Sequence, residues 1–583
     1  MTVSKAPASG LCILVWLVGL EWHVAGGAPV RGRRNNRVMA FWRGLMQPIR
    51  YAALLAGALP VLAFPAPNLE FLAWFGLVPG LFIMRASPSA REAAVRGWWF
   101  GAGFILAAHY WLAPNIGPAL LLVAVVLGAL WIPVGVSTWV LLRPPITAAR
   151  ALAALVVVPS YWLVIEWIRS WQGFGGPWAL LGASQWQHPA VLALAAVGGV
   201  WLVSFAIVAA NTGIVILLAA ARTPVRALGA VAVAVVIVAG PAAFALAPAP
   251  HPARFVTVTL VQPGIQHNPL QRVNASERLS RDLGRLRPDL IVWGESSIAY
   301  DLHRAPRQLA GLESLSAADG AQVLVNQDSR TPGGKSKVAV LVGPGGIAAT
   351  YTKTRLVPFG EYIPFRQQLG WLTKISKAAP TNMIPGTGAK VMQVTTRDGQ
   401  HVPIGVLICF ESAFPDMSRA DARRGAQLIV YQTSDSTFQQ SWAPAQHASR
   451  GALRAAETGR PVVQAALTGD SAAYDAQGRL LASMTAAQRG LLTVRLGLTP
   501  AGALTPFDRV GDVVPWTAIG IALLAAILLL WVWRRRRSAK IMEGVNFRGT
   551  EFVSLRGASR EQDAGSEPAA PGEDTASSRQ TGR

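Results

Sequence analysis

Long apolar runs separated by short polar stretches fill the chain between about residues 51 and 247. Most of them approach the roughly 20 residues that an α-helix needs to cross a bilayer core. Seven runs lie in this half and an eighth follows near the end: 51–66, 68–84, 97–113, 118–142, 151–168, 190–221, 226–247 and 513–533. The first two are short and are joined by Pro-Ala-Pro-Asn, which is compatible with a tight helical hairpin. The pattern predicts a polytopic α-helical membrane protein with about eight transmembrane helices.

A different pattern begins at residue 254. Short apolar runs rich in β-branched residues alternate with helical stretches, and Gly, Pro and Asp lie at the breaks. This alternation is typical of one α/β domain, and about 250 residues are enough to bury its core. The predicted strands are 255–261, 290–293, 322–326, 338–342, 402–409, 428–431, 462–466 and 491–494, and two predicted helices are 275–286 and 445–458.

Composition and charge narrow the class of protein. Hydrophobic residues make up 52% of the chain and charged residues only 14%, against roughly 25% charged in an ordinary soluble domain. The chain has 53 Lys and Arg against 30 Asp and Glu, a net charge of +23. These basic residues border the apolar runs and do not form one face with aromatic residues, which argues against a nucleic-acid-binding protein. The two cysteines, Cys12 and Cys409, are too far apart in sequence for a disulfide framework or a thiolate metal cluster.

The arginines also indicate which way the protein crosses the membrane. They precede the first run and lie between the second and third, fourth and fifth, and sixth and seventh runs, whereas the loops near Pro67 and Asn115 have none. Only Arg169 breaks this alternation. Because cytoplasmic loops carry an excess of Lys and Arg, we expect both termini in the cytoplasm. The α/β domain is then expected on the extracytoplasmic side of the plasma (inner) membrane.

Five segments are expected along the chain. They are an N-terminal extension that is not folded (1–44), a membrane domain with about seven transmembrane helices (45–250), a catalytic domain (251–510), the last transmembrane helix (511–534) and a basic stop followed by a disordered cytoplasmic tail (535–583). The apolar stretch 11–20 is followed by Arg-rich sequence, the wrong flank for a signal peptide. We expect it to stay outside the membrane, with Met39 as the effective start of the protein.

Three candidate catalytic residues lie at the ends of predicted strands. Glu295 follows the strand 290–293, Lys353 lies in Tyr-Thr-Lys-Thr-Arg-Leu-Val-Pro-Phe-Gly-Glu, and Cys409 ends Ile-Gly-Val-Leu-Ile-Cys. Side chains at strand ends converge on ligands in α/β sheets. A cysteine attacks as the thiolate, a carboxylate can take its proton, and a lysine can stabilise negative charge on a carbonyl oxygen. Taken singly, each residue also has an ordinary structural interpretation: a core cysteine, a turn carboxylate or a solvated lysine.

Together, these motifs carry a family resemblance. The order Glu, then Tyr-x-Lys-x-x-Leu-Val-Pro-Phe-Gly-Glu, then Cys-Phe-Glu resembles the carbon–nitrogen hydrolase (nitrilase) superfamily. Apolar spans before and after the domain make the chain, over about 45–535, similar to the bacterial apolipoprotein N-acyltransferases. The resemblance implies an α-β-β-α sandwich of the nitrilase type. It also implies Glu295 as base, Lys353 as oxyanion stabiliser and Cys409 as nucleophile. The residues with implied supporting roles are Glu361, which would hold Lys353, Phe410 and Glu411.

The resemblance also implies a function. It implies a ping-pong enzyme that moves a fatty acyl chain from a phospholipid, through a cysteine thioester, to the α-amino group of the N-terminal diacylglyceryl-cysteine of lipoproteins. No cofactor, metal or nucleic acid is expected, the lipid bilayer is the expected surroundings, and a monomer is the expected state. Two alternatives stay open. One is a membrane-tethered amidase or nitrilase with the same triad; the other is a non-catalytic membrane scaffold for polyprenol-mannose synthesis.

Some positions depart from the family pattern. Gly294 stands where Pro is usual, Phe410 where Tyr is frequent, and 434–438 lacks the usual Trp. The triad is complete, so these departures concern recognition of the acceptor more than catalysis. An insert at 365–384, rich in aromatic and apolar residues, has two interpretations: an arm that dips into lipid, or an ordinary helix packed on the domain.

Overall fold

The computed structural model describes residues 47–247, 251–252, 254–266, 268–281, 283–331, 333–374, 379–438, 440–532 and 534–535. The expectations for the extension 1–44, including the stretch 11–20 and the start at Met39, lie outside the described residues. The same holds for the tail from 536 to 583.

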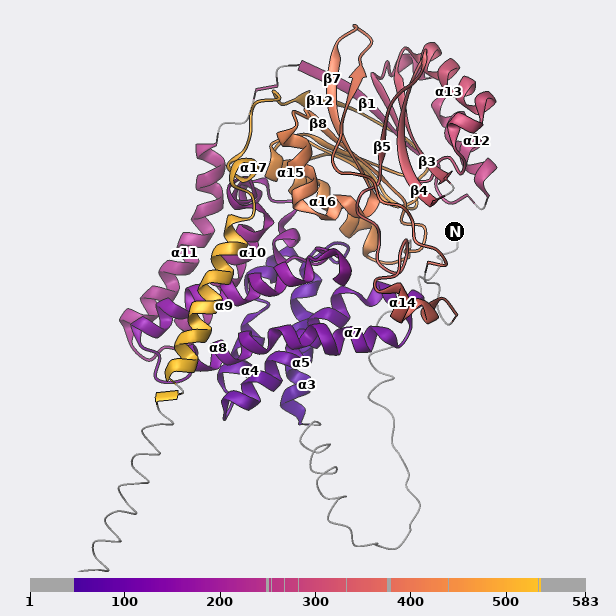
Figure 1. The fold of residues 1–583 in the computed structure, drawn as a ribbon. Coiled ribbons are helices and arrows are strands. Elements are labelled where there is room, and N and C mark those ends of the chain that lie inside the picture. Colours follow the sequence, from indigo (N-terminus) through magenta and orange to yellow (C-terminus); the bar gives the residue numbers. More distant parts are fainter. Residues whose placement is uncertain are drawn as a thin grey trace, which may run out of the picture. The chain divides into compact units, whose positions relative to one another are not determined.

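The described residues of the first half, 47–247, are mostly helical (Figure 1), and their sequence is apolar. Its α-helices are α3 Pro48–Ala58, α4 Val78–Arg85, α5 Ala90–Ala108, α6 Ala113–Ile116, α7 Ala119–Gly128, α8 Ile132–Leu142, α9 Ala148–Arg169, α10 Pro189–Ala219 and α11 Thr223–Leu246. Short 3₁₀ turns lie between them: η1 Leu59–Ala63, η2 Glu70–Trp74, η3 Tyr110–Leu112, η4 Ala129–Trp131, η5 Gln172–Phe174 and η6 Leu181–Gln185. Side-chain caps start two of the long helices, because Ser89 Oγ accepts from Glu92 N at 3.2 Å and Thr147 Oγ1 accepts from Arg150 N at 3.3 Å.

Within the described residues, five helical segments are long and apolar enough to cross a membrane. They are Ala119–Leu142, Ala148–Arg169, Pro189–Ala219, Thr223–Leu246 and Val513–Val532. The chain is therefore a polytopic membrane protein, as predicted. The expected spans 51–66 and 68–84 are shorter than predicted: the first corresponds to α3 with η1, and the second is divided into η2 and α4. Turns around Pro65 and Pro67, and between η2 and α4, interrupt the helices in segments where hydropathy alone predicts continuous spans.

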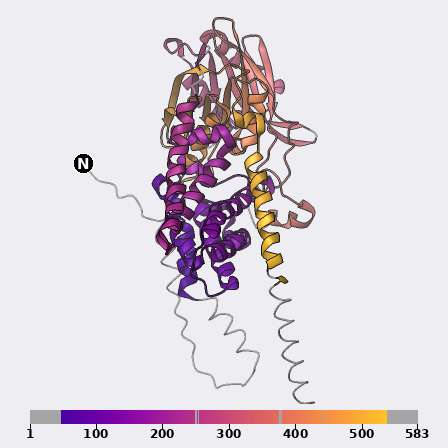
Figure 2. The same cartoon turned by 90° about the vertical axis from the view of Figure 1, so that its left-hand side faces the viewer.

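The last apolar segment is a single helix in both views (Figures 1 and 2, in yellow). It packs on α9: Tyr161 Oη donates to the carbonyl of Ala522 at 3.1 Å. The rings of Trp167 and Trp516 lie 5.8 Å apart. The helix Val513–Val532 thus packs against the helices of the first half.

Helix α10 is interrupted by a pair of glycines. Gly199 has φ +70°, a conformation that L side chains avoid, and a Cβ there would lie 2.7 Å from the ring of Phe507. The break frees the N–H of Val200 from the helix, and this group donates to Glu457 Oε1 at 2.8 Å. Because Glu457 belongs to helix α16, Ala443–Thr458, the interruption links the helical half to the α/β domain.

The α/β domain contains two six-stranded sheets (Figure 1). The first has the order β12-β1-β2-β3-β4-β5, with β1 Arg254–Gln262, β2 Leu290–Trp293, β3 Gln322–Thr331, β4 Gly334–Gly343, β5 Gly346–Thr352 and β12 Gly490–Leu498. The second has the order β11-β10-β9-β8-β7-β6, with β6 Val391–Thr395, β7 His401–Ile408, β8 Leu428–Thr433, β9 Val462–Ala466, β10 Ser471–Tyr474 and β11 Leu480–Met484. All eight predicted strands are present; β5, β6, β10 and β11 were not predicted.

Helices cover the outer face of each sheet. The first sheet carries α12 Pro269–Ser280 and α13 Pro306–Asp319, and the second carries α15 Pro415–Arg423 and α16 Ala443–Thr458. Between the sheets, Leu260 and Val292 of the first pack in one fully buried core with Val406 and Val430 of the second. The layers are therefore α-β-β-α, the nitrilase-type sandwich that the resemblance implied.

The described part of the insert 365–384 holds only two short elements, α14 Arg366–Leu369 and η9 Gly370–Lys374. The side chains of Phe365 and Trp371 are 71% and 55% exposed. Insertion of this arm into lipid stays a prediction. Packing of this short helical stretch on the domain likewise stays a prediction.

Candidate active site

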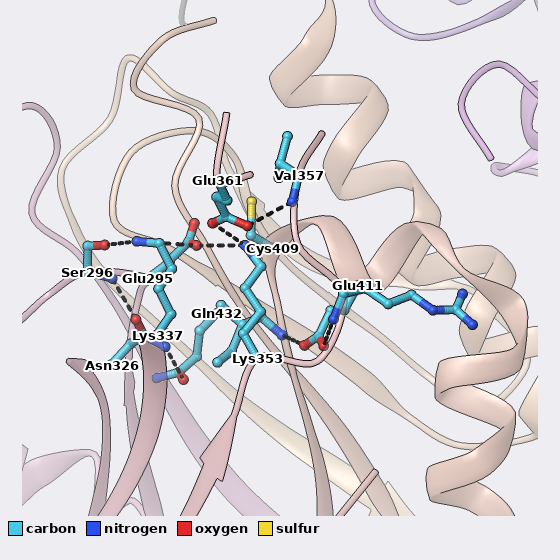
Figure 3. Close-up of polar contacts among 12 residues, drawn as sticks. Glu295, Ser296, Asn326, Lys337, Lys353, Val357, Glu361, Cys409, Glu411 and Gln432 are labelled. Carbon is cyan, nitrogen blue, oxygen red and sulfur yellow. Dashed lines mark hydrogen bonds and ion pairs between the residues drawn. The ribbon is translucent and has the colours of Figure 1, made fainter. Parts of the chain in front are cut away.

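Three strands deliver the candidate residues to one place. Glu295 lies just beyond the end of β2, Lys353 directly follows β5, and Cys409 directly follows β7. Lys353 Nζ is 3.1 Å from Glu295 Oε1, and the Cys409 thiol interacts with the charges of both. The site lies where strand ends of the two sheets meet (Figure 3). The convergence expected from the sequence is thus present.

Cys409 occupies a sharp turn between β7 and η10 Cys409–Ala413. Its φ of +52° lies in the left-handed region, which is uncommon for a residue with a side chain. Two side chains contact its carbonyl oxygen: Ser412 Oγ donates to it at 2.8 Å and His447 Nε2 lies 3.2 Å away. His447 is itself held from the other side, with Nδ1 2.9 Å from Asp435 Oδ1. These contacts fix an otherwise unfavourable turn and point the thiol into the site.

Glu361 lies against the amine of Lys353. Glu361 Oε1 accepts from Lys353 Nζ at 2.7 Å, and Oε2 accepts from the backbone N–H of Val357 at 2.8 Å. Lys353 is completely buried. The ammonium group therefore has two carboxylates as partners, which limits its freedom to move.

Glu411 joins the Cys409 turn to the segment that follows Lys353. One carboxylate oxygen accepts from Ile408 N at 2.7 Å. The other accepts from Thr354 N at 2.6 Å, Arg355 N at 3.0 Å and Tyr351 Oη at 2.8 Å. Glu411 is fully buried, so its loss would leave these donors without a partner.

Burial and charge shift the protonation of the site. Burial raises the pKa of Glu295, but the ammonium groups of Lys353 and Lys337 lower it more, to about 2. Burial lowers the pKa of Lys353, yet the carboxylates of Glu295 and Glu361 leave it well above its usual value. Burial and then the Glu295 carboxylate raise the pKa of the Cys409 thiol well above its usual value. The resting site therefore contains a thiol, two carboxylates and ammonium groups.

Lys337, on β4, is a site residue that the sequence did not reveal. Its Nζ is 3.6 Å from Glu295 Oε1 and 3.1 Å from Asp328 Oδ1, and it also makes a short contact with Ser296 Oγ. Figure 3 shows the Glu295 carboxylate between the amines of Lys337 and Lys353. The pairing of β4 with the unpredicted strand β5 brings the two lysines together, since Lys353 N donates to the Lys337 carbonyl at 2.9 Å.

Gly294, a departure from the family pattern, is explained by a close backbone approach. A Cβ at this position would lie 2.0 Å from Leu467 N and 2.8 Å from the carbonyl carbon of Ala466. The backbone amides of Glu295 and Leu467 both donate to the carbonyl of Thr433, at 3.1 and 2.9 Å. The absence of a side chain lets the end of β9 pass against the residue before Glu295.

One wall of the site comes from the helical half, in the loop between α9 and α10. A Cβ on Gly176, which has φ +72°, would lie 2.8 Å from the rings of Phe410 and Phe414. Gln172 Nε2 donates to the carbonyl of Leu356 at 2.8 Å. Phe410, where the family often has Tyr, packs edge-on against Phe414 with ring centres 4.9 Å apart. Its place in the site is thus set by apolar packing.

A second aromatic contact bears on the segment 434–438, which lacks the usual Trp. Phe438 packs edge-on against Trp111 of η3, with ring centres 4.9 Å apart. Trp111 in turn lies 4.8 Å from the ring of Trp178. Aromatic side chains of the helical half therefore cover this part of the domain.

Among the described residues, no group of three or more His, Cys, Asp or Glu is arranged to hold a metal ion.

A two-sheet sandwich with Glu, Lys and Cys at its strand ends, set between apolar helices, defines a membrane-bound protein of the carbon–nitrogen hydrolase class. The family model described as "Carbon-nitrogen hydrolase" matches residues 257–504, and "Apolipoprotein N-acyltransferase N-terminal domain" matches 56–213. A relative named apolipoprotein N-acyltransferase from Geobacter metallireducens is 30% identical over 508 residues, 82% of this chain and 94% of the relative. One from Azotobacter vinelandii is 30% identical over 517 residues, covering 85% and 97%. The chain belongs to the apolipoprotein N-acyltransferase family, which confirms the resemblance found in its motifs.

Solved structures also match parts of the chain. An amidase from Nesterenkonia sp. AN1 is 20% identical, covers 41% of this chain and 92% of its own, and has a TM-score of 0.30. A carbon–nitrogen hydrolase from Helicobacter pylori G27 is 15% identical, covers 42% and 89%, and has a TM-score of 0.33.

Proposed function

We propose that the protein takes a fatty acyl chain from a phospholipid and transfers it, through a thioester on Cys409, to the α-amino group of the diacylglyceryl-cysteine at the N-terminus of lipoproteins. The observation that carries this proposal is the meeting of Cys409, Glu295 and Lys353 in a domain set between apolar helices. The alternating arginines favour the plasma (inner) membrane, with the domain on the extracytoplasmic side and both termini in the cytoplasm.

In the first half-reaction, Glu295 takes the proton of the Cys409 thiol as the sulfur attacks the carbonyl carbon of a phospholipid ester. A carbon–sulfur bond forms and the carbonyl oxygen becomes an oxyanion. Glu295 then returns the proton to the ester oxygen as the carbon–oxygen bond breaks. Lysophospholipid leaves, and the acyl chain stays on Cys409 as a thioester.

Lys353 stabilises the oxyanion that forms in this step. Its ammonium group is already charged, buried and held by Glu361 at 2.7 Å, so it needs little reorganisation when negative charge develops. A backbone N–H near Phe410 supplies a second donor. The low local dielectric strengthens both interactions.

In the second half-reaction, the neutral α-amine of the acceptor attacks the thioester. Glu295 takes a proton from the attacking nitrogen, the carbon–sulfur bond breaks, and the proton returns to Cys409. The product is an amide. Because both substrates carry acyl chains anchored in lipid, an aromatic wall around a membrane-facing site favours the amine over water.

Mass spectrometry of the protein after incubation with phospholipid tests the first half-reaction. We expect an acyl adduct on the peptide that contains Cys409. The adduct should be lost in Cys409→Ser and strongly reduced in Lys353→Met, and it should remain in the control Lys335→Met, which removes an exposed lysine of β4. No adduct in the unaltered protein would refute the proposal and favour the scaffold alternative.

Addition of a diacylglyceryl-cysteine peptide to the isolated acyl-enzyme tests the second half-reaction. We expect the adduct to leave as the N-acyl peptide, at a rate that rises with peptide concentration. Release of free fatty acid at a rate independent of the peptide would show transfer to water instead. That result would favour the membrane-tethered amidase alternative.

A further inference from the structure

Two lysines flank the candidate base, although one would be enough to form the triad. Lys353 follows β5 and Lys337 lies opposite it on β4, where Val338 pairs with Thr352 in the antiparallel ladder. Like charges at such neighbouring positions repel unless an anion lies between them. Glu295 provides this anion, because its Oε1 is 3.1 Å from Lys353 Nζ and 3.6 Å from Lys337 Nζ (Figure 3).

Lys337 also has a polar connection toward solvent. Ser296 Oγ donates to Asp328 Oδ1 at 2.9 Å, and the same Asp328 oxygen lies 3.1 Å from Lys337 Nζ. The Lys337 side chain is 12% exposed, whereas the Asp328 side chain is 39% exposed. Water therefore screens the Asp328 charge, and the buried charge that Lys337 faces most directly is that of Glu295.

The buried charged groups that ion pairs link to Glu295 balance only when Lys337 is counted. Glu295 and Glu361 contribute two negative charges, and Lys353 and Lys337 contribute two positive charges. Glu361 is the closest partner of Lys353, at 2.7 Å. Without Lys337, this cluster of ion pairs would lose one of its two positive charges just when the oxyanion forms.

The first half-reaction shows where such an environment matters. The tetrahedral intermediate can expel either the thiolate of Cys409 or the alkoxide of the lysophospholipid. A thiol has a pKa of about 8.5, and an alcohol is a far weaker acid, so the thiolate leaves more easily. The reaction goes forward only if the departing oxygen receives a proton as its bond breaks.

We propose that Lys337 is a positioning residue for Glu295: it holds the carboxyl group between two ammonium groups, so that the proton taken from Cys409 passes readily to the departing oxygen of the acyl donor. This inference rests on the proposed function. A protonated Glu295 next to two positive charges gives up its proton more easily than it would next to one. Lys337 thus makes the Glu295 carboxylate a weaker base and the protonated Glu295 a stronger acid.

The second half-reaction has the opposite requirement. There the leaving group is the thiolate, which needs no proton to depart, and Glu295 acts only as a base toward the amine. Removal of Lys337 should therefore slow transfer from an oxygen ester and leave transfer to the amine unchanged or faster.

A comparison of two acyl donors tests the role of Lys337. The p-nitrophenolate of a p-nitrophenyl ester leaves without being protonated, whereas the alkoxide of a phospholipid requires a proton. For Lys337→Met we expect formation of the Cys409 adduct from phospholipid to slow about threefold to tenfold, with little change for the p-nitrophenyl ester. Lys337→Arg keeps the charge and should keep both rates, and Lys335→Met, an exposed lysine on the same strand, is the matched control.

The pH profile gives a second measure that a merely structural role would not change. The pKa of Glu295 is about 2 in the intact site, so adduct formation should be insensitive to Glu295 protonation down to about pH 4. In Lys337→Met, loss of one ammonium group should move the acid limb upward by about one pH unit. In Asp328→Asn, which removes the other carboxylate near Lys337, the limb should stay in place or move downward.

An equal slowing with both donors, or no change with either, would overturn the proposal. If Lys337→Met does not fold, an upward shift of the acid limb in Asp328→Asn would be equally contrary to it. Failure of the proposed function has a different signature, because the unaltered protein would then form no adduct from phospholipid. In that case an aliphatic ester and a p-nitrophenyl ester of the same soluble acid test Lys337 without phospholipid.

Discussion

Substitution of Gly294 by Ala tests whether the approach of β9 positions Glu295. The new Cβ would lie 2.0 Å from Leu467 N, against about 3.4 Å for an ordinary contact. The two backbone segments must therefore separate by more than 1 Å, because the nearest atoms belong to the main chain. The amides of Glu295 and Leu467 share the Thr433 carbonyl as acceptor, so this separation weakens both hydrogen bonds.

The cost follows from two contributions. Overpacking of a tight site costs about 1–3 kcal/mol, and weakening of two backbone hydrogen bonds adds roughly 0.5–1.5 kcal/mol each. We expect a loss of about 2–6 kcal/mol in the free energy of unfolding. A displacement of about 1 Å at a catalytic group costs roughly 100-fold in rate, so adduct formation should fall by about two orders of magnitude.

The assay compares two glycine-to-alanine variants in detergent solution by thermal melting and by the rate of Cys409 acylation. Gly311 in α13 is the matched control, because nothing lies within 4 Å of a Cβ at that position. Alanine there should slightly raise the melting temperature, since it is the better helix former by about 1 kcal/mol. Equal melting temperatures and equal rates for Gly294→Ala and the unaltered protein would refute the reasoning.

Two further predictions concern buried carboxylates. Burial raises the pKa of Glu457 to about 7, and the charge of Arg454 opposes this shift. A carboxyl group with a raised pKa in the folded state contributes stability that is lost as the pH rises through that pKa. The melting temperature should therefore fall between about pH 5 and pH 8. Glu457→Gln should flatten this dependence, by up to about 3 kcal/mol across the range, and an unchanged slope would contradict the assignment. Glu411→Ala leaves the buried amides of Thr354 and Ile408 without an acceptor, so stability should fall by about 3 kcal/mol and Cys409 acylation with it. Retention of both in thermal melting and acylation assays would show that water replaces the carboxylate.

Strand ends were the part of the site that the sequence could predict. Glu295 follows an apolar run and Cys409 ends one, so local periodicity places both at strand ends, and the order of the motifs adds Lys353 to them. Lys337 had no such signal: it lies within β4, and its position in the site depends on the antiparallel pairing of β4 with β5. The half-buried strand β5 has no long apolar run, so neither its pairing with β4 nor the second lysine could be predicted from local pattern.

Close contacts between backbone segments that are distant in the chain could not be predicted from the sequence either. Gly294 reads as an ordinary turn residue, and only the position of β9, which is distant in the chain, shows why a side chain is excluded there. The membrane helices show the reverse limit. Hydropathy predicted the long helices α9, α10 and α11 well, but it could not detect where the backbone of 68–84 breaks, since apolar composition continues through the turn.

The loop between α9 and α10 has a consequence for how the protein can be divided. The two family models cover residues 56–213 and 257–504 separately, yet Gly176 and Gln172, from the first, contact Phe410 and Leu356 in the second. A soluble fragment that begins at 254 would expose the rings of Phe410 and Phe414 to water. A chimaera that combines halves of two relatives must therefore take the loop between α9 and α10 and the hydrolase domain from the same parent. The two family models mark sequence boundaries, but the contacts between this loop and the domain decide which segments can be exchanged together.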